Sequence, residues 1–259
     1  MTYVLSVSMN DYSIVDRLWS FMPPLYSWII LFHYPDNPRV QWATALISLW
    51  GFRLTFNFWR KGGYASGGED YRWGYLRENI PPWAFQLLNI TFISTMQHAL
   101  LLGLTLPVLV AGQTPFQGWT VMDVVALDTM VSAIIAETVA DEQQWQFHQK
   151  KKDNPLQSKE TRDGFISSGL WRYSRHPNFC AEQTYWIAVT LFSFTCTRIF
   201  GTWWDVGSIF LVALFQGSTW LTEKITLSKY PAYSSYQQAT SRLLPWIPGS
   251  WPGNKEHEN

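Results

Sequence analysis

The sequence predicts an all-α protein, a polytopic integral membrane helical bundle of about six transmembrane helices, or seven, with basic loops in the cytosol. Charged residues make up only 15% of the 259 residues, whereas about a quarter is usual in soluble domains. Long apolar stretches alternate with charged segments, and the cations gather in every second segment. A soluble helical bundle, the alternative, would carry more charge and would not segregate it in this way.

Six stretches approach the length of about 20 residues that a helix needs to cross a bilayer. The clearest has thirty-two residues without Asp, Glu, Lys or Arg. The first is the weakest, because Pro23 and Pro24 interrupt it and predict a kinked or partly interfacial helix. The predicted spans are 19–34, 40–59, 81–112, 119–140, 183–200 and 202–221.

The distribution of cations predicts the topology, because positively charged loops stay on the cytoplasmic side. Fifteen of the nineteen Lys and Arg residues lie in three segments, 59–80, 148–178 and 222–259. The connections on the other side of the predicted membrane hold only Arg39. We therefore expect a multi-pass membrane protein, in the endoplasmic reticulum of a eukaryote or in the inner membrane of a bacterium.

Several classes of protein are disfavoured. Acidic and basic side chains balance at 19 each, so we expect no nucleic acid as partner. Cys180 and Cys196 form neither a disulfide framework nor a metal site. The first ten residues lack the pattern of a cleavable signal peptide. We expect a single domain over 1–259 with an irregular tail over 245–259, and no obligate protein partner is evident.

Ionisable side chains follow one face of the fourth predicted span. Glu137, Asp141, Gln144 and His148 are spaced four, three and four apart, which places them along one side of a helix. A charge inside a span costs about 2.5–3.5 kcal/mol, so these residues are candidates for a functional site. Two alternatives remain open, a helix end that emerges into water and a structural ion pair between Glu137 and Arg53.

The segment before the fifth span carries the most specific pattern. Pro177 suits the first turn of a helix, so Arg175, His176 and Asn178 lie at a helix N-terminus, which favours an anion such as a phosphate. Glu182 follows Asn178 by one helical turn, where a carboxylate can accept from ribose hydroxyls or hold Arg175. Arg175 as a plain membrane anchor is the alternative.

These residues resemble a known family. The chain is similar to membrane enzymes of the steroid 5-alpha-reductase superfamily, in particular its DUF1295 branch, whose C-terminal half is similar to that of 3-oxo-5-alpha-steroid 4-dehydrogenase. The resemblance runs from about residue 10 to 247, and the Arg-His-Pro-Asn block is its most specific part. The motifs that carry it are Asp16-Arg-Leu-Trp19, Glu69-Asp-Tyr-Arg-Trp73, Glu137-Thr-Val-Ala-Asp141-Glu-Gln143, Gly169-Leu-Trp-Arg-Tyr-Ser-Arg-His-Pro-Asn178 with Glu182, and Lys229-Tyr-Pro-Ala-Tyr233 with Ser241-Arg-Leu-Leu-Pro245.

The resemblance implies NADPH as cofactor, bound from the cytosolic side, and reduction of an activated carbon–carbon double bond in a steroid or other lipid. It implies that Asp141, Asn178 and Glu182 bind the cofactor. The same resemblance puts Arg175 and His176 near the phosphates or the nicotinamide, and Glu137 at another cofactor contact. By the same resemblance, the Arg and His that contact the cofactor in the steroid-reducing members fall near Phe215 and Thr219, which cannot play the same part.

Reduction of an enone needs a proton as well as a hydride. Tyr71, in the first basic loop, and His98, within the third predicted span, are the candidate catalytic donors. For Tyr71 the alternative is an anchor at the membrane interface. For His98 it is a hydrogen-bonded core residue.

Two other functions remain open. Membrane methyltransferases of the isoprenylcysteine and phospholipid type, which use S-adenosylmethionine, also have an Arg-His-Pro block before a span and a downstream Glu. They usually continue with Tyr-x-Gly, whereas this chain has Asn178-Phe-Cys-Ala. A non-catalytic membrane protein is the second alternative.

Overall fold

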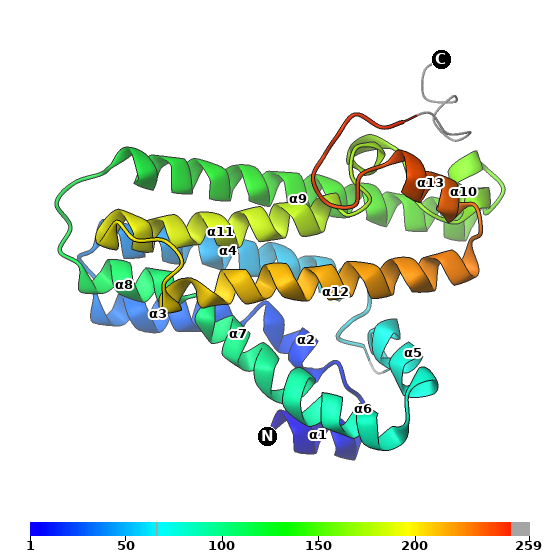
Figure 1. Cartoon of the computed structure of the whole chain (residues 1–259), viewed down its shortest axis with the longest axis horizontal. Helices are drawn as coiled ribbons and strands as arrows, with labels where there is room; N and C mark the ends of the chain where they lie inside the picture. Colours follow the sequence, from blue (N-terminus) through cyan, green and yellow to red (C-terminus); the bar gives the residue numbers. More distant parts are fainter. Residues whose placement is uncertain (66, 250–259) are drawn as a thin grey trace. The chain divides into compact units, whose positions relative to one another are not determined.

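The computed structural model describes residues 1–65 and 67–249, and within them all regular structure is helical (Figure 1). The all-α prediction is therefore confirmed for these residues. The helices are α1 (Thr2–Met9), α2 (Ile14–Trp19), α3 (Met22–His33), α4 (Pro38–Arg60), α5 (Tyr71–Asn79), α6 (Pro82–Leu88), the π-helix η1 (Asn89–Met96), α7 (Gln97–Gly103), α8 (Leu106–Gln113), α9 (Val121–Asp153), α10 (Lys159–Asp163), the 3-10 helix η2 (Gly169–Arg172), α11 (Pro177–Thr197), the 3-10 helix η3 (Trp203–Asp205), α12 (Val206–Lys229) and α13 (Tyr233–Ala239). Residues 245–249 contain no helix, and the rest of the predicted tail, 250–259, lies outside the described residues.

Each predicted span falls largely within helical structure. Pro23 and Pro24 lie in the first turn of α3, so they start this helix instead of kinking it, and the prediction of a kink was wrong. Among the described residues one stretch, Pro82–Gln113, is both long and apolar enough to cross a membrane, and half of its most apolar part is buried.

The chain divides into two compact units. The first comprises Met1–Val131 and Trp186–Leu211, and the second comprises Ser132–Tyr185 and Val212–Asn259. The boundaries between the units fall inside α9, α11 and α12. The single domain that we expect over residues 1–259 stays a prediction.

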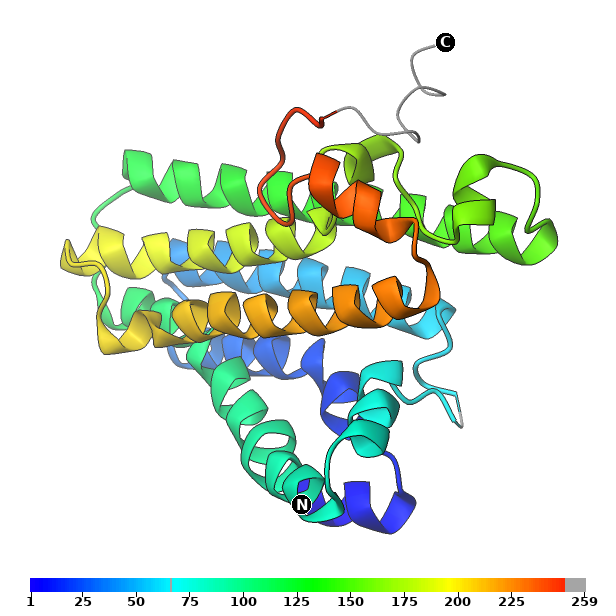
Figure 2. The same cartoon turned by 45° about the vertical axis from the view of Figure 1, so that its right-hand side comes forward.

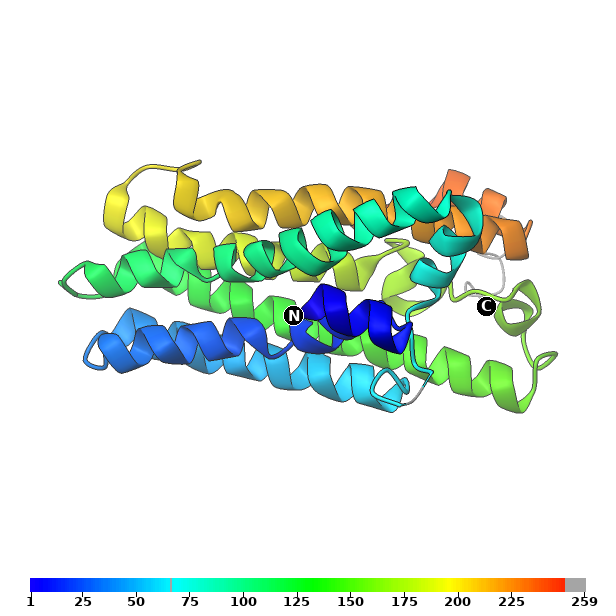
Figure 3. The same ribbon diagram turned by 90° about the horizontal axis from the view of Figure 1, so that it is seen from below.

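In the first unit, α1 lies beside the π-helix η1 (Figure 3). The side chain of Asn89 is fully buried there and shares hydrogen bonds with Ser6 and Ser94. The Asn89 to Ser94 bond joins positions five apart, the spacing of a π-helix. The wider helical turn thus gives the buried amide one of its partners, and α1 supplies the other.

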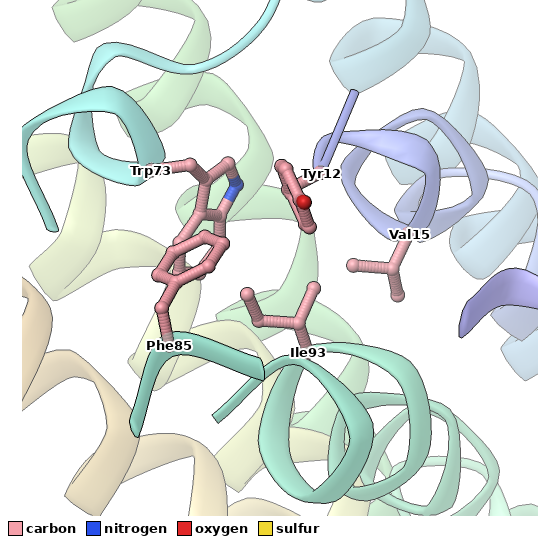
Figure 4. Close-up of a cluster of buried hydrophobic side chains, with 5 residues drawn as sticks. All are labelled: Tyr12, Val15, Trp73, Phe85 and Ile93. Atoms are coloured by element: carbon pink, nitrogen blue, oxygen red, sulfur yellow. The ribbon is translucent and has the colours of Figure 1, made fainter. Parts of the chain in front are cut away.

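A small aromatic core joins the N-terminal helices to α5 and α6. Tyr12, Val15, Trp73, Phe85 and Ile93 point toward one another (Figure 4). The rings of Tyr12 and Phe85 meet edge to face, with centroids 4.8 Å apart. The motif Glu69 to Trp73 is thus part of a packed corner of the first unit.

Two glycines let α7 and the start of α12 approach each other. A Cβ atom on Gly207 would lie 2.3 Å from the carbonyl carbon of Gly103 and 2.4 Å from the nitrogen of Leu104. Both contacts are with backbone atoms, which cannot swing away. The two helices can pack at this distance only because position 207 lacks a side chain.

Arg39 and Asp123 form a buried ion pair in the first unit. The guanidinium donates from Nε and Nη2 to the two carboxylate oxygens at 2.8 and 2.9 Å. Thr120 donates its backbone N–H and its hydroxyl to the same carboxylate. This pairing explains both the single cation of the predicted non-cytosolic connections and an acidic residue within the fourth predicted span.

In the second unit, the chain after α12 turns back through α13 and runs beside residues 173–175 (Figure 2). The backbone N–H of Arg175 donates to Ser241, and that of Trp246 donates to Tyr173. Tyr236 of α13 donates its hydroxyl to the backbone carbonyl of Trp171. The loop before α11 is therefore held by the C-terminal segment.

Candidate functional site

The loop before α11 is fixed against α9. The side chain of Gln143 accepts a hydrogen bond from the backbone of Leu170 at 2.9 Å, and the indole of Trp171 donates to the carbonyl of Ala140 at 3.1 Å. Gly169 has a φ of 60°, and a Cβ atom there would lie 2.5 Å from the Gln143 side chain. The positive φ favours glycine at this position, and the close Gln143 amide adds to that preference.

The structure brings together two of the predicted cofactor residues. The amide of Asn178, in the first turn of α11, donates to the carboxylate of Asp141 on α9 at 3.3 Å. Glu137 lies one turn before Asp141 on α9, and Glu182 lies one turn after Asn178 on α11. Both glutamates and Asp141 are buried. Three acidic side chains and an amide therefore occupy facing turns of these two helices.

Arg175 is engaged within the protein. Its Nε and Nη2 donate to Glu223 of α12 at 2.7 and 3.0 Å, and its Nη1 donates to the carbonyls of Gln237 and Thr240. Arg175 thus ties the start of α11 to α12 and to the end of α13. The ion pair made with Glu223 differs from the predicted alternative, in which Glu182 holds Arg175.

His176 binds the same carboxylate. Its Nε2 lies 2.9 Å from Oε1 of Glu223, and its ring stacks on Phe179 with an interplanar angle of 16°. Phe179 in turn contacts the ring of Phe215, with centroids 4.5 Å apart. Phe215 therefore supports the aromatic side of the site.

Glu223 is the residue that the sequence prediction missed. Burial raises the pKa of Glu223, but hydrogen bonds from His176, Arg175 and Gln237 outweigh burial and lower the pKa to about 2. Its carboxylate is therefore ionised at neutral pH. A signal existed in the sequence: Arg175 precedes one predicted span and Glu223 follows the next, so both lie on the same predicted side.

An open cleft of about 550 Å³ borders this network. Arg175, Gln237, Thr240 and Ser241 contribute polar atoms to its wall, while Leu244 and Trp246 contribute apolar surface. Its volume lies in the range of about 300–1,000 Å³ that is usual for small-molecule sites. An amphipathic ligand could contact both kinds of wall.

The two predicted proton donors belong to the first unit, whereas the six predicted cofactor residues belong to the second. Tyr71 is the first residue of α5 and is half exposed. His98, on α7, shares a hydrogen bond of 2.9 Å with Thr2. A hydrogen-bonded structural role for His98 is therefore present in the fold.

Among the described residues no group of three His, Cys, Asp or Glu side chains could hold a metal ion.

A family model described as "Protein of unknown function (DUF1295)" matches residues 2–240. The chain belongs to the DUF1295 family. This family is related to steroid 5-alpha-reductase-like enzymes. The chain is also similar to "Uncharacterized protein C594.04c" of Schizosaccharomyces pombe, with 35% identity over 264 positions that cover 95% of this chain and 76% of the relative. No solved structure matches the chain. The match to DUF1295 includes the six predicted cofactor residues, the two predicted proton donors and Glu223, whereas Ser241, Leu244 and Trp246 of the cleft lie beyond it.

Proposed function

We propose that this DUF1295 protein is a membrane-embedded, NADPH-dependent reductase of an activated carbon–carbon double bond in a steroid or other lipid. The observation that carries the proposal is the buried contact between Asp141 and Asn178, with Glu137 and Glu182 one turn away. These residues come from two motifs far apart in the sequence, and both motifs match the cofactor positions of the reductase superfamily. Such a cluster of buried acids at a helix start suits the hydroxyl and amide donors of a nucleotide.

When bound, NADPH would supply the hydride, and the chain would supply orientation and electrostatics. Asp141 and Glu182 would accept hydrogen bonds from the ribose or carboxamide. Asn178 would hold Asp141 and read the nucleotide with its amide. Tyr71 and His98 stay the candidate proton donors. Leu244 and Trp246 on the wall of the open cleft favour a substrate with an apolar part, such as a lipid.

The proposal includes six membrane spans with the basic loops in the cytosol. Exposed tryptophans near the helix ends support it, since tryptophan is enriched at membrane interfaces. Between them, large aliphatic and aromatic side chains are exposed along the helices, more than a protein surrounded by water usually tolerates. The exposed tryptophans near helix ends are Trp42, Trp59, Trp83, Trp119 and Trp203.

Cysteine labelling tests this topology. A cysteine introduced at Ser158, in the loop after α9, is expected to react with an impermeant reagent from the cytosolic side. A cysteine introduced at Gln117, before α9, is expected to react from the opposite side. Labelling with the reverse pattern would overturn the arrangement of the spans.

Quenching of tryptophan fluorescence by NADPH tests the cofactor. Glu182→Gln keeps the shape of the side chain and removes its charge, so nucleotide affinity is expected to fall roughly tenfold to a hundredfold, as for the loss of a hydrogen bond to a charged group. Asn178→Ala should behave similarly. Glu78→Gln makes the same chemical change on an exposed residue of α5 and should leave affinity unchanged. If both site variants bind NADPH and turn over an enone as the wild type does, Glu182 and Asn178 do not bind the cofactor. If the wild-type protein binds no NADPH and turns over no enone, the family resemblance is one of fold without this function.

One observation favours a second candidate, an S-adenosylmethionine-dependent membrane methyltransferase. Such enzymes combine an Arg-His-Pro block with a downstream Glu, and here Glu223 binds both Arg175 and His176. The residues after Pro177 still differ from the methyltransferase pattern. Binding of S-adenosylmethionine without binding of NADPH in the same fluorescence assay would replace the reductase with this function.

A further inference from the structure

The C-terminal segment, residues 241–249, keeps three large apolar side chains outside the core of the second unit. Leu244, Trp246 and Ile247 are 75%, 75% and 82% exposed. One exposed apolar residue is ordinary, and Leu156, 73% exposed in the loop after α9, is such a case. Three such residues within four positions form an apolar patch instead, which indicates a partner surface.

The exposure of this patch is imposed by the backbone. The N–H of Trp246 donates to the carbonyl of Tyr173 at 3.0 Å, and the hydroxyl of Ser174 donates to the carbonyl of Leu243 at 2.7 Å. Pro245 lies between these two attachments and has no backbone N–H of its own. The three apolar side chains cannot turn into the core unless these hydrogen bonds break.

A hollow of about 270 Å³ lies within the patch. Its lining residues are Tyr173, Pro245, Trp246 and Ile247, and none of these four is charged. A polar ligand would give up its hydrogen bonds to water there and regain few of them, whereas a hydrocarbon chain has none to give up. The hollow therefore suits hydrocarbon.

The C-terminal segment lies level with the predicted cytosolic boundary of the membrane. Arg242 donates from Nη2 to Oε1 of Gln216, near the end of the sixth predicted span. Tyr173, which holds Trp246, comes four residues before α11 begins at Pro177. Both attachments therefore lie toward the ends of α11 and α12 that the distribution of cations assigns to the cytosol.

The charges favour a membrane over a second copy of the chain as the partner. The guanidinium of Arg242 forms no ion pair with the described residues. A symmetric contact between two copies would bring these cations together, whereas lipid phosphates would neutralise them. On α12, the ammonium of Lys224 lies 5.2 Å from the ring centre of Trp220, which is exposed. An exposed tryptophan beside a long cationic side chain is typical of a membrane interface.

We propose that residues 241–249 form an interfacial membrane anchor, in which Leu244, Trp246 and Ile247 insert among the lipids of the cytosolic leaflet and Arg242 lies at the level of their phosphates. The anchor rests on the membrane spans of the proposed function, but it is independent of the cofactor and of the reaction. Leu244 and Trp246 also form part of the wall of the open cleft. The cleft then borders lipid, from which an apolar ligand can enter without crossing water.

Spin labels on the protein in vesicles of phosphatidylcholine and phosphatidylglycerol, in equal amounts, test the insertion. A labelled cysteine replaces Ile247 in a chain without its native thiols, Cys180→Ala and Cys196→Ala. Oxygen collects in hydrocarbon, whereas a water-soluble nickel complex stays outside it. We expect the ratio of oxygen to nickel collisions to be several-fold higher for Ile247→Cys than for Leu156→Cys, the matched control of similar exposure.

A label at Ile135→Cys, an exposed position within the fourth predicted span, tests the spans separately. A preference for oxygen there and for nickel at Ile247→Cys would leave the spans intact and overturn the anchor. Few collisions with either reagent at Ile247→Cys would mean that protein covers the segment, either a second copy or residues 250–259, and would also overturn the anchor. A preference for nickel at Ile135→Cys would count against the spans of the proposed function.

A second set of variants keeps the test valid if a variant misfolds. If the chain without native thiols does not fold, the labels are read in a chain that keeps Cys180 and Cys196, with the labelled wild type subtracted as background. Trp246→Cys should show the same preference for oxygen as Ile247→Cys, because both side chains belong to the patch. Opposite preferences at these two positions would contradict the proposal.

Discussion

Removal of the Asp123 carboxylate is expected to destabilise the protein strongly. Asp123 is fully buried and accepts four hydrogen bonds, two from Arg39 and two from Thr120. In Asp123→Ala the guanidinium of Arg39, itself only 4% exposed, keeps the carbonyl of Gly118 and the ring of Phe116 but has no counter-charge. Breaking one side of a buried ion pair costs about 3–5 kcal/mol, so we expect the free energy of unfolding to fall by that amount.

The double variant Arg39→Met with Asp123→Leu separates the charge from the packing. With both charges removed, no charge is left buried alone, and apolar side chains fill the space. We therefore expect the double variant to be within about 1 kcal/mol of the wild type, well above Asp123→Ala. Unfolding in detergent, followed by tryptophan fluorescence, measures all variants. Asp36→Ala, at an exposed acid near the same end of α4, serves as control and should change stability by less than about 0.5 kcal/mol.

Two results would refute the reasoning. A loss below about 1 kcal/mol in Asp123→Ala would mean that the carboxylate is not needed to neutralise Arg39. Additive effects in the double variant would mean that the two residues act independently.

Three further predictions concern other parts of the fold. Gly207→Ala should lower the free energy of unfolding by about 1–3 kcal/mol or more, because its Cβ atom meets the backbone of α7. The control Gly217→Ala, in the same helix, meets nothing within 4 Å and should raise the free energy of unfolding by up to about 1 kcal/mol. The pKa of Glu223 is lowered from 4.5 to about 2, so the contribution of its carboxylate to stability is complete above pH 4.5. About 3 kcal/mol of the free energy of unfolding should be lost as the pH falls from about 4.5 to 2. Unfolding measured over this acid range checks the loss, which should be absent from Glu223→Gln. Burial raises the pKa of Asp16, so its ionised form opposes folding; Asp16→Asn should be at least as stable as wild type at pH 7, and a destabilised variant would contradict this.

Much of the helical fold could be predicted from the sequence, because runs without charge that are bounded by charged or proline residues leave little choice. Pro177 marks the start of α11 in both sequence and structure. Pro23 and Pro24 were misjudged, since a proline starts or kinks a helix according to where the helix begins, and the boundary at Met22 carries no capping side chain. The π-helix Asn89–Met96 left no sequence signal, because it depends on a buried amide and on Ser6, far away in the chain.

The site could be predicted only in part. Asp141 and Asn178 stand at motif positions, and their contact follows from the pairing of α9 with α11. The role of Glu223 depends on α12 returning to the start of α11, which no local pattern reveals. Arg175 looked available to an anion because its four internal hydrogen bonds come from segments between 48 and 65 positions away.

The position of α1 beside the π-helix has a consequence for synthesis. Thr2 and His98 are 96 positions apart, and Ser6 and Asn89 are 83 apart. The helix α1 leaves the ribosome before its docking surface, which lies 83 to 96 positions further along the chain. At a usual rate of about 5–20 residues per second, α1 therefore waits for several seconds without its native partners. An insertion factor or chaperone that shields the N-terminal helix has its opportunity in that interval.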